Sequence, residues 1–148
     1  MYKHILLPTD GSKLSAKAVK QAVQFAKSAG AKVTALHVSP PYRTLMDDGF
    51  VLSAVATLKK RFEEESIKRS NLLLERVKSG AQAAGIDCDC VSVIGDLPYD
   101  AIIKQARKAK CDLIMMASHG RKGLASILLG SETAKVLAHS TIPVLVVR

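Results

Sequence analysis

Short apolar runs alternate with segments of helical periodicity along the whole chain of 148 residues. Five of the runs suit β-strands, and a helical pattern stands between each consecutive pair. Such alternation is typical of βαβ units around a parallel sheet, whose crossovers are right-handed. We therefore predict an α/β fold, with residues 1–148 as a single domain. Its doubly wound, five-stranded parallel sheet has the strand order 3-2-1-4-5 and helices on both faces.

Capping residues, prolines and glycines give the boundaries of these elements. Ser12 suits an N-cap, Gly30 suits a helix stop, and Pro98 suits the first turn of a helix. Residues 40–52 carry two prolines and no clear period, so we expect an excursion that acts as a flap. The expected strands are His4–Pro8, Val33–Val38, Cys88–Ile94, Asp112–Ala117 and Val144–Val147, and the expected helices are 12–30, 53–84, 98–106 and 131–139.

The formal net charge of +9 raises the question of a nucleic-acid partner, because a basic patch is the electrostatic footprint of phosphate binding. The basic residues fall on the outward faces of the helical patterns, where a solvated helix surface explains them. Lys13, Lys17, Lys20 and Lys27 are an example. No pair of aromatic residues suited to stacking on bases is visible. We therefore expect no nucleic-acid partner.

The start of the chain and its cysteines indicate a compartment. The opening MYKHILLPTD contains a three-residue apolar run, too short for a signal peptide or a membrane span. Cys88, Cys90 and Cys111 are odd in number and lie in apolar segments, which favours free thiols under reducing conditions. A second ligand pair at zinc-site spacing is missing. We expect a cytoplasmic protein with no membrane partner and no metal site.

Polar residues follow the first and fourth predicted strands. In an open parallel sheet, ligands sit outside the carboxyl ends of the strands where the strand order reverses. The predicted order puts that point between these two strands. Thr9 and Asp10 end the first of them, and Ser118, His119 and Gly120 follow the fourth. A ligand is therefore expected between the two groups.

The segment ASHGRKGLASILLGSET carries the sharper signal. Gly120 and Gly123 let the backbone approach a ligand closely, and Gly130-Ser131 opens a helix. The N-terminus of a helix has unpaired amides and partial positive charge, both of which favour a phosphate. Ser131 suits a phosphate ligand or a helix cap, and the segment alone does not separate these roles. Gly130→Val is expected to abolish phosphate binding, because its side chain would fill the space next to the amides.

The same segment resembles the nucleotide-binding pattern of the universal stress protein family: Gly, two residues, Gly, nine residues, Gly, then Ser or Thr. The chain has Ala117 in place of the first glycine, followed by Gly120, Gly130 and Ser131 in register. The resemblance also covers the opening ILLPTDGS, the strand ALHV, the turn GDL and the closing PVLVVR. It therefore spans essentially the entire chain.

The resemblance implies a set of adenosine and phosphate contacts. The Asp10 carboxylate would accept hydrogen bonds from the ribose hydroxyls, and Val38 would offer backbone groups to the adenine edge. The implied cofactor is ATP, AMP or another adenine nucleotide, with Mg²⁺ bound through its phosphates. The implied residues are Pro8, Thr9, Asp10 and Val38 around the adenosine, Met116 and Ala117 at the base and sugar, and Ser118, His119, Gly120, Gly130, Ser131 and Glu132 around the phosphates.

Several of these residues have a second interpretation. Asp10 also suits a turn before Gly11. His119 has no identifiable nucleophile or acid partner, so we expect it to hydrogen-bond rather than to act as a base. Arg121 meets phosphate charge or belongs to a solvated loop tip. Glu132 departs from the family, where an apolar residue is common, and its carboxylate would repel a γ-phosphate.

Three functions fit this sequence. The leading hypothesis is a nucleotide-binding stress-response sensor or regulator, in which the ligand orders the 118–130 loop and alters the surface offered to an unidentified protein partner. The alternative is a slow ATPase or nucleotidyl transferase at the same site, although a GxxxxGK[ST] loop and a carboxylate cluster for metal are missing. A nucleotide-free structural stress protein is the third, and the retained glycine pattern disfavours it.

The last strand, Val144–Val147, is predicted to lie at an edge of the sheet. It is apolar and has no charged residue before Arg148, so its unpaired edge would invite aggregation. Antiparallel pairing with the same strand of a second copy covers this edge in both chains and gives a closed dimer. We therefore expect a homodimer through this strand, as the resemblance also implies.

Overall fold

A computed structural model describes residues 1–43, 52–120 and 129–148 of the chain. Within this part, five strands form one parallel sheet in the order β3-β2-β1-β4-β5, which confirms the predicted fold and strand order. The strands are β1 (His4–Pro8), β2 (Lys32–Ser39), β3 (Cys88–Ile94), β4 (Leu113–Ala117) and β5 (Val144–Val147), and the helices are α1 (Lys13–Ala29), α2 (Leu52–Ala83), α3 (Pro98–Lys108) and α4 (Ser131–His139).

The capping residues expected from the sequence account for the ends of α1. The side chain of Ser12 accepts a hydrogen bond from the backbone N–H of Ser15, as an N-cap does. Gly30 ends the helix in the left-handed region with φ of 61°. At the start of β4 the expected boundary moves by one residue. Asp112 lies just outside the strand, where its carboxylate accepts hydrogen bonds from the amides of Lys3 and His4.

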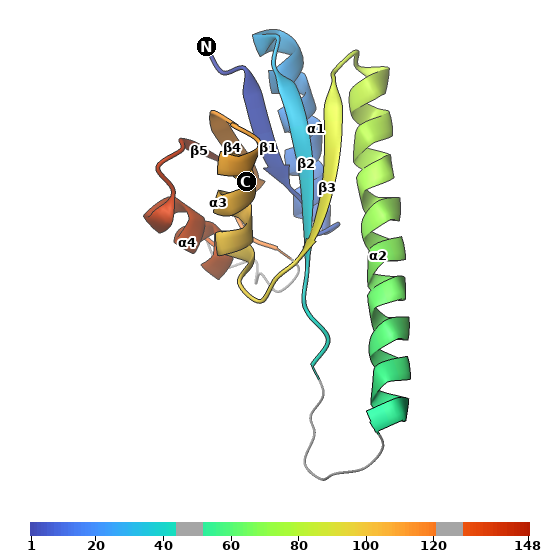
Figure 1. Cartoon of the computed structure of the whole chain (residues 1–148). Coiled ribbons are helices and arrows are strands. Elements are labelled where there is room, and N and C mark those ends of the chain that lie inside the picture. The colour runs from blue at the N-terminus through green and yellow to red at the C-terminus, as the bar shows by residue number, and fades with distance from the viewer. Residues whose placement is uncertain (44–51, 121–128) are drawn as a thin grey trace.

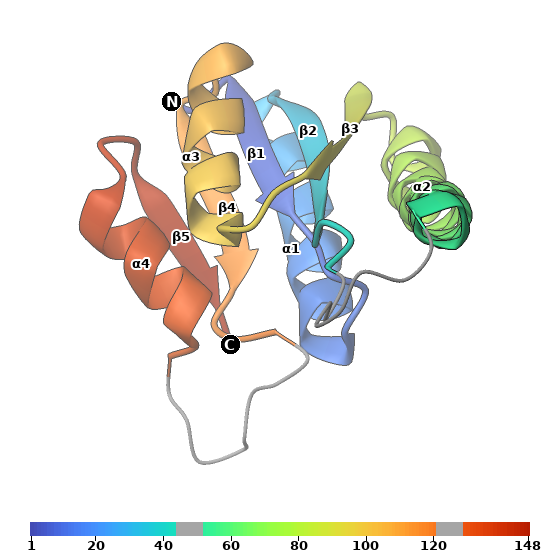
Figure 2. The ribbon, with the colours of Figure 1, turned by 60° about the horizontal axis from the view of Figure 1, so that its bottom comes forward.

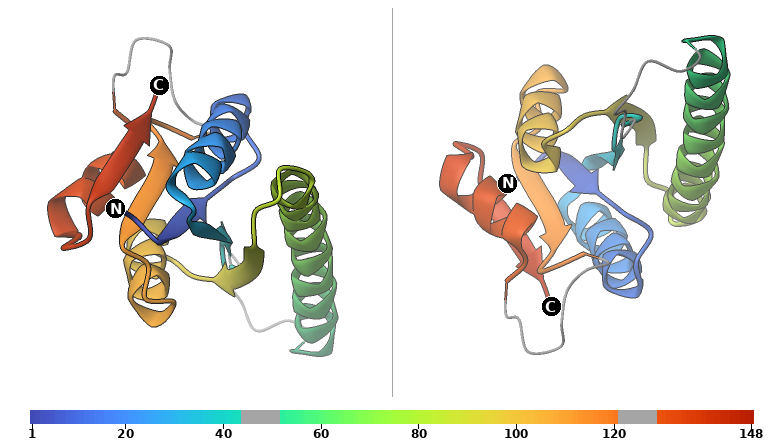
Figure 3. Two further views of the ribbon diagram at one scale, coloured as in Figure 1. Left: turned by 90° about the horizontal axis from the view of Figure 1, so that it is seen from above. Right: turned by 90° about the horizontal axis from the view of Figure 1, so that it is seen from below.

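The helices cover the sheet in two layers (Figures 1 and 2). α1 and α2 pack on one face through alanine, leucine and valine side chains, α1 chiefly against β1 and β4 and α2 chiefly against β2 and β3. α3 and α4 pack on the other face, with Ile102, Ala106 and Val136 against Leu6, Leu36 and Ile114. Figure 3 shows the same sandwich along the strands. Both faces of the central strands are therefore buried, as their continuous apolar runs predict.

Polar and charged side chains follow the sequence interpretation. Lys13, Lys17, Lys20 and Lys27 are all exposed on α1. The three cysteines are free thiols, of which Cys88 and Cys111 are buried and Cys90 is half-buried. No helix in the described ranges is long and apolar enough to cross a membrane. Residues 44–51 of the expected flap lie outside the described residues.

Two glycines near helix ends should respond in opposite ways to alanine. A β-carbon at Gly30 or at Gly80 would have no atom within 4 Å, so steric contacts do not decide either result. Gly30→Ala should destabilise the protein by about 1 kcal/mol, because alanine is strained at positive φ. Gly80→Ala, inside α2, should stabilise it by about 0.5 kcal/mol, because alanine favours the helix. Urea unfolding measures the free energy of unfolding of both variants. A change of the same sign and size in the two variants would contradict the prediction.

Candidate functional site

A cavity of about 780 Å³ lies at the carboxyl ends of β1 and β4, where the strand order reverses. Its volume is within the range of about 300–1,000 Å³ that is usual for small-molecule sites. Leu36, Val38, Ile102 and Met116 give it an apolar wall. Polar residues at the ends of β1 and β4 and at the start of α4 also line it. We call it the switch-point cavity.

Most of the predicted site residues meet in this cavity. Ser118 does not line it, because the residue is 3% exposed and its hydroxyl is hydrogen-bonded to Nδ1 of His119 at 3.2 Å. Arg121 lies outside the described residues. The predicted residues that line the cavity are Pro8, Thr9, Asp10, Val38, Met116, Ala117, His119, Gly120, Gly130, Ser131 and Glu132.

The turn after β1 holds Asp10 in a defined position. Its Oδ1 accepts a hydrogen bond from the backbone N–H of Ser12 at 2.9 Å, so Asp10 is a turn residue as well as a lining residue. Thr9 extends the pairing of β1 by donating its N–H to the carbonyl of Leu36. The Thr9 hydroxyl is hydrogen-bonded to the buried hydroxyl of Ser15. This chain of short contacts fixes the Asp10 carboxylate at the edge of the cavity.

Gly120 brings the loop after β4 close to Asp10. A β-carbon at Gly120 would lie 2.6 Å from Oδ2 of Asp10, a distance that requires one of the two to move. The two polar segments that the sequence assigns to one site are therefore in contact distance across the switch point. Glycine at position 120 is needed for this approach even before a ligand is considered.

The loop that follows β4 is closed at its ends by a backbone hydrogen bond. The N–H of Gly130 donates to the carbonyl of Ser118 at 2.6 Å, and the N–H of Ser118 donates to the carbonyl of Val147 at 2.7 Å. Thr133 adds a third tie, since its hydroxyl donates to the carbonyl of Ala117 at 2.9 Å. The start of α4 is thereby fixed against the carboxyl end of β4.

The first turn of α4 presents backbone amides without helical partners. Gly130 is the N-cap and provides no side-chain cap, so the structure excludes one of the two roles left open for Ser131, that of helix cap. Ser131 is the first helical residue and is exposed. Helical geometry gives the first-turn amides no intrahelical acceptor. An anion at this end of the cavity would meet those amides and the positive end of the helix dipole.

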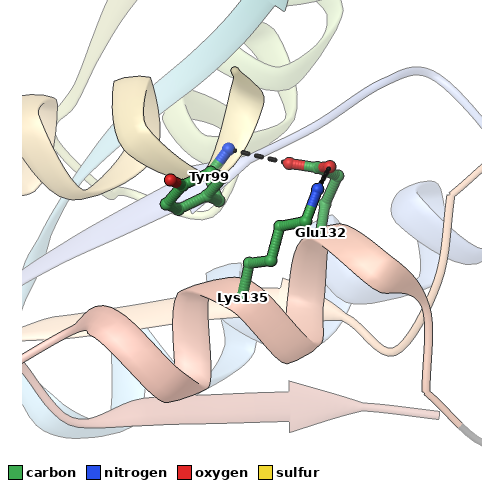
Figure 4. Close-up of polar contacts among 3 residues, drawn as sticks. All are labelled: Tyr99, Glu132 and Lys135. Carbon is green, nitrogen blue, oxygen red and sulfur yellow. Dashed lines mark hydrogen bonds and ion pairs between the residues drawn. The ribbon is translucent and has the colours of Figure 1, made fainter.

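The first turn of α3, in contrast, already has an anionic partner (Figure 4). Oε2 of Glu132 accepts a hydrogen bond from the backbone N–H of Tyr99 at 2.9 Å. Oε1 of the same carboxylate pairs with Nζ of Lys135 at 3.0 Å. Lys135 also lies 5.6 Å from the centre of the Tyr99 ring. Glu132 therefore joins α4 to α3 at the rim of the cavity.

Sequence reasoning missed a further part of the lining. Leu36 and Ile102 are recognisable as apolar positions, but the residue pattern does not say that they end beside a cavity. Thr133 has no sequence signal, because its bond to Ala117 depends on the packing of α4 against β4. The lining residues that were missed are Ser15, Leu36, Pro98, Ile102, Leu129 and Thr133.

A second, smaller hollow of about 370 Å³ lies between β3 and α3. Its rim includes Ile94 and Leu97, which are each about half exposed. The acidic Asp96 and Asp100 there are paired with Arg43 and Lys104. The hollow gathers none of the predicted site residues, so the switch-point cavity is the better candidate site.

Comparison with known proteins gives a consistent family. The sequence model of the universal stress protein family matches residues 1–148. Universal stress protein MJ0577 of Methanocaldococcus jannaschii is 36% identical over 156 residues, which cover 100% of this chain and 96% of that protein. The solved structure of hypothetical protein MJ0577 superposes with a TM-score of 0.83 at 31% identity, covering 99% of this chain and 96% of the other.

A second solved structure carries information about a ligand. It is a universal stress protein in complex with cAMP, and it superposes with a TM-score of 0.72 at 29% identity. The superposition covers 99% of this chain and 97% of that protein. An adenine nucleotide therefore binds to a protein that is similar to this one along its full length.

Gly130→Val should destabilise the folded protein, which makes it a poor test of phosphate binding. A β-carbon at position 130 would lie 2.9 Å from Cα and Cβ of His119, so the side chain meets protein and not only ligand space. We expect a loss of about 1–3 kcal/mol, as for overpacking elsewhere. Ser131→Ala changes an exposed side chain one position away and should stay within about 0.5 kcal/mol of the parent. Thermal unfolding measures the stability of both variants relative to the parent protein. A Gly130→Val variant as stable as the parent would contradict the steric argument.

Proposed function

We propose, from the premise that the chain belongs to the universal stress protein family, that it binds an adenine nucleotide in the switch-point cavity. The observation that carries the proposal is the meeting of the Asp10 carboxylate, an apolar wall and the open first turn of α4 around one cavity. These three features match the ribose, the base and the phosphate of one ligand. Residues 1–148 would then form one nucleotide-binding domain.

The ligand orientation follows from the chemistry of the lining. Adenine is apolar on its faces and suits the wall of Leu36, Val38, Ile102 and Met116. The fixed Asp10 carboxylate suits the ribose hydroxyls, which donate to it. The phosphate then reaches the Gly130-Ser131 turn, where amides and the helix dipole stabilise negative charge. ATP fits this scheme with Mg²⁺ held through its phosphates, and AMP fits it without a metal.

We propose that nucleotide occupancy is a regulatory signal rather than a step in turnover. The described lining contains no lysine or arginine to stabilise a transferring phosphoryl group. Among the described residues, no cluster of three or more potential ligands could hold a metal ion. Binding would instead change the surface near the switch point, where an unidentified protein partner would sense it.

The contact between Asp10 and the ribose can be tested by removing a hydroxyl from the ligand. We expect the parent protein to bind AMP about tenfold more tightly than 2′-deoxy-AMP, and Asp10→Asn to lose this preference, because a charged acceptor strengthens the bond to a hydroxyl. Asparagine keeps an oxygen for the N–H of Ser12, so the turn is retained. Titration calorimetry with both nucleotides measures the ratio.

Asp96→Asn is the matched control, because Asp96 pairs with Arg43 outside the switch-point cavity. It should keep the preference for AMP. If the parent protein binds neither nucleotide, adenine-nucleotide binding is refuted. If purified protein instead releases phosphate from ATP at about 1 per second or faster, the ATPase alternative is favoured over a purely regulatory site.

We also propose that two copies pair through the open edge of β5. Residues 143 and 147 direct their carbonyls to β4, since these accept hydrogen bonds from Ile114 and Ser118. Alternation along the strand then points the amide of Val146 away from β4. Val144, Leu145 and Val146 are only half-buried, and a second β5 strand would cover them.

Val146→Pro should therefore convert a dimer to a monomer, because it removes an amide on the pairing edge. Ser92→Pro on β3 is the matched control. β3 is the strand at the other edge of the sheet. Asp87 and Gly95 direct backbone groups to β2, so alternation along β3 points the amide of Ser92 away from the sheet. Sedimentation velocity at micromolar concentration should report a dimer for the parent and the Ser92 variant. A monomeric parent protein would refute the proposal.

A further inference from the structure

The described lining of the switch-point cavity is acidic although the protein is basic. Its formally charged residues are Asp10 and Glu132, and it includes no lysine or arginine. The whole chain nevertheless has a net charge of +9. Many of the cations lie on exposed helix faces such as that of α1, and Lys135, which does not line the cavity, pairs with Glu132.

Glu132 satisfies the N-terminus of α3 from another helix. Pro98, the first residue of α3, has no amide hydrogen, and the amides of Asp100 and Ala101 donate to the carbonyl of Leu97. The remaining first-turn amide, that of Tyr99, donates to Glu132. The amides at this helix end are therefore all engaged, and the carboxylate occupies the place where an external anion would otherwise sit.

The two helix ends that border the cavity thus differ in their capacity for a further anion. The first turn of α4 has no side-chain cap and can receive a phosphate. The first turn of α3 already has the carboxylate of Glu132, whose side chain is 36% exposed. Each phosphate beyond the first would bring more negative charge toward that carboxylate. Lys135, paired with Glu132 on the side of α4, offsets this repulsion only in part.

We infer that Glu132 makes the cavity select adenine nucleotides by phosphate charge, so that monophosphates bind better than ATP. The inference rests on the proposed adenine-nucleotide binding and adds the ligand class to it. Glu132 acts here as a specificity-determining residue, because its repulsion grows with the charge of the phosphate chain. The base and the ribose, which meet other parts of the lining, do not contribute to this discrimination.

The test is a charge series of ligands on the intact protein. Affinities for cAMP, AMP, ADP and ATP are measured by titration calorimetry at low ionic strength without divalent cations, where charge repulsion is least screened. For the parent protein, affinity should fall from AMP to ATP. In Glu132→Gln the affinity for ATP should rise about tenfold, equivalent to about 1.4 kcal/mol, while that for AMP changes less than about threefold.

A second variant should act in the opposite direction. Lys135→Gln removes the cation that partly offsets Glu132, so it should weaken ATP binding severalfold and AMP binding less. Lys135 does not line the cavity. In Glu132→Gln the side-chain carbonyl can still accept a hydrogen bond from the Tyr99 amide, so neither change removes the cap of α3. Thermal unfolding checks that both variants remain folded.

Asp100→Asn is the matched control for the loss of a carboxylate. Asp100 is in the first turn of α3 but pairs with Lys104 outside the switch-point cavity, and its variant should keep the parent ratio of ATP to AMP affinity. An unchanged ratio in Glu132→Gln overturns the inference while leaving nucleotide binding intact. Absence of binding to every nucleotide of the series, in the parent protein, overturns the proposed function and the inference with it.

Discussion

The pairing of β1 with β2 on one side and β4 on the other is the constraint on which the functional part of the molecule depends. The connections that leave the carboxyl ends of β1 and β4 diverge, because α1 covers one face of the sheet and α4 the other. The described residues of the two connections line a cavity between them. A cavity at this point is therefore a consequence of the strand order, and the residues that leave the two strands decide its chemistry.

The sequence was sufficient for the fold and for most of the lining, for identifiable reasons. Periodicity and caps depend on local residues, which is why α1 begins after Ser12 and ends at Gly30 as expected. The roles of Ser131 and Glu132 depend on contacts between elements. Whether Ser131 caps α4 is decided by where the helix begins, and Glu132 meets Tyr99 only because α3 and α4 pack together. No spacing along the chain encodes that contact.

The protein separates its charges by location. Its exposed helix faces carry an excess of lysine and arginine, which raises the local concentration of anions around the molecule. The described lining of the switch-point cavity carries carboxylates instead. Attraction of anions at long range and repulsion of highly charged ligands at short range are different functions. Separate residues perform them. In the proposed function, the surface favours the approach of any nucleotide, and the lining decides which one stays.

The hydrogen bond between Gly130 and Ser118 also has an evolutionary consequence. It closes the connection at both ends, next to the sheet, so the length of chain between those ends is not needed to hold β4 against α4. Lengthening a closed loop costs little conformational entropy, about 0.6 kcal/mol for each doubling. By this entropic measure, a longer connection between Ser118 and Gly130 would cost the fold little. The tie between β4 and α4 lies in the two ends themselves, so evolution can change the number of residues between them without removing it.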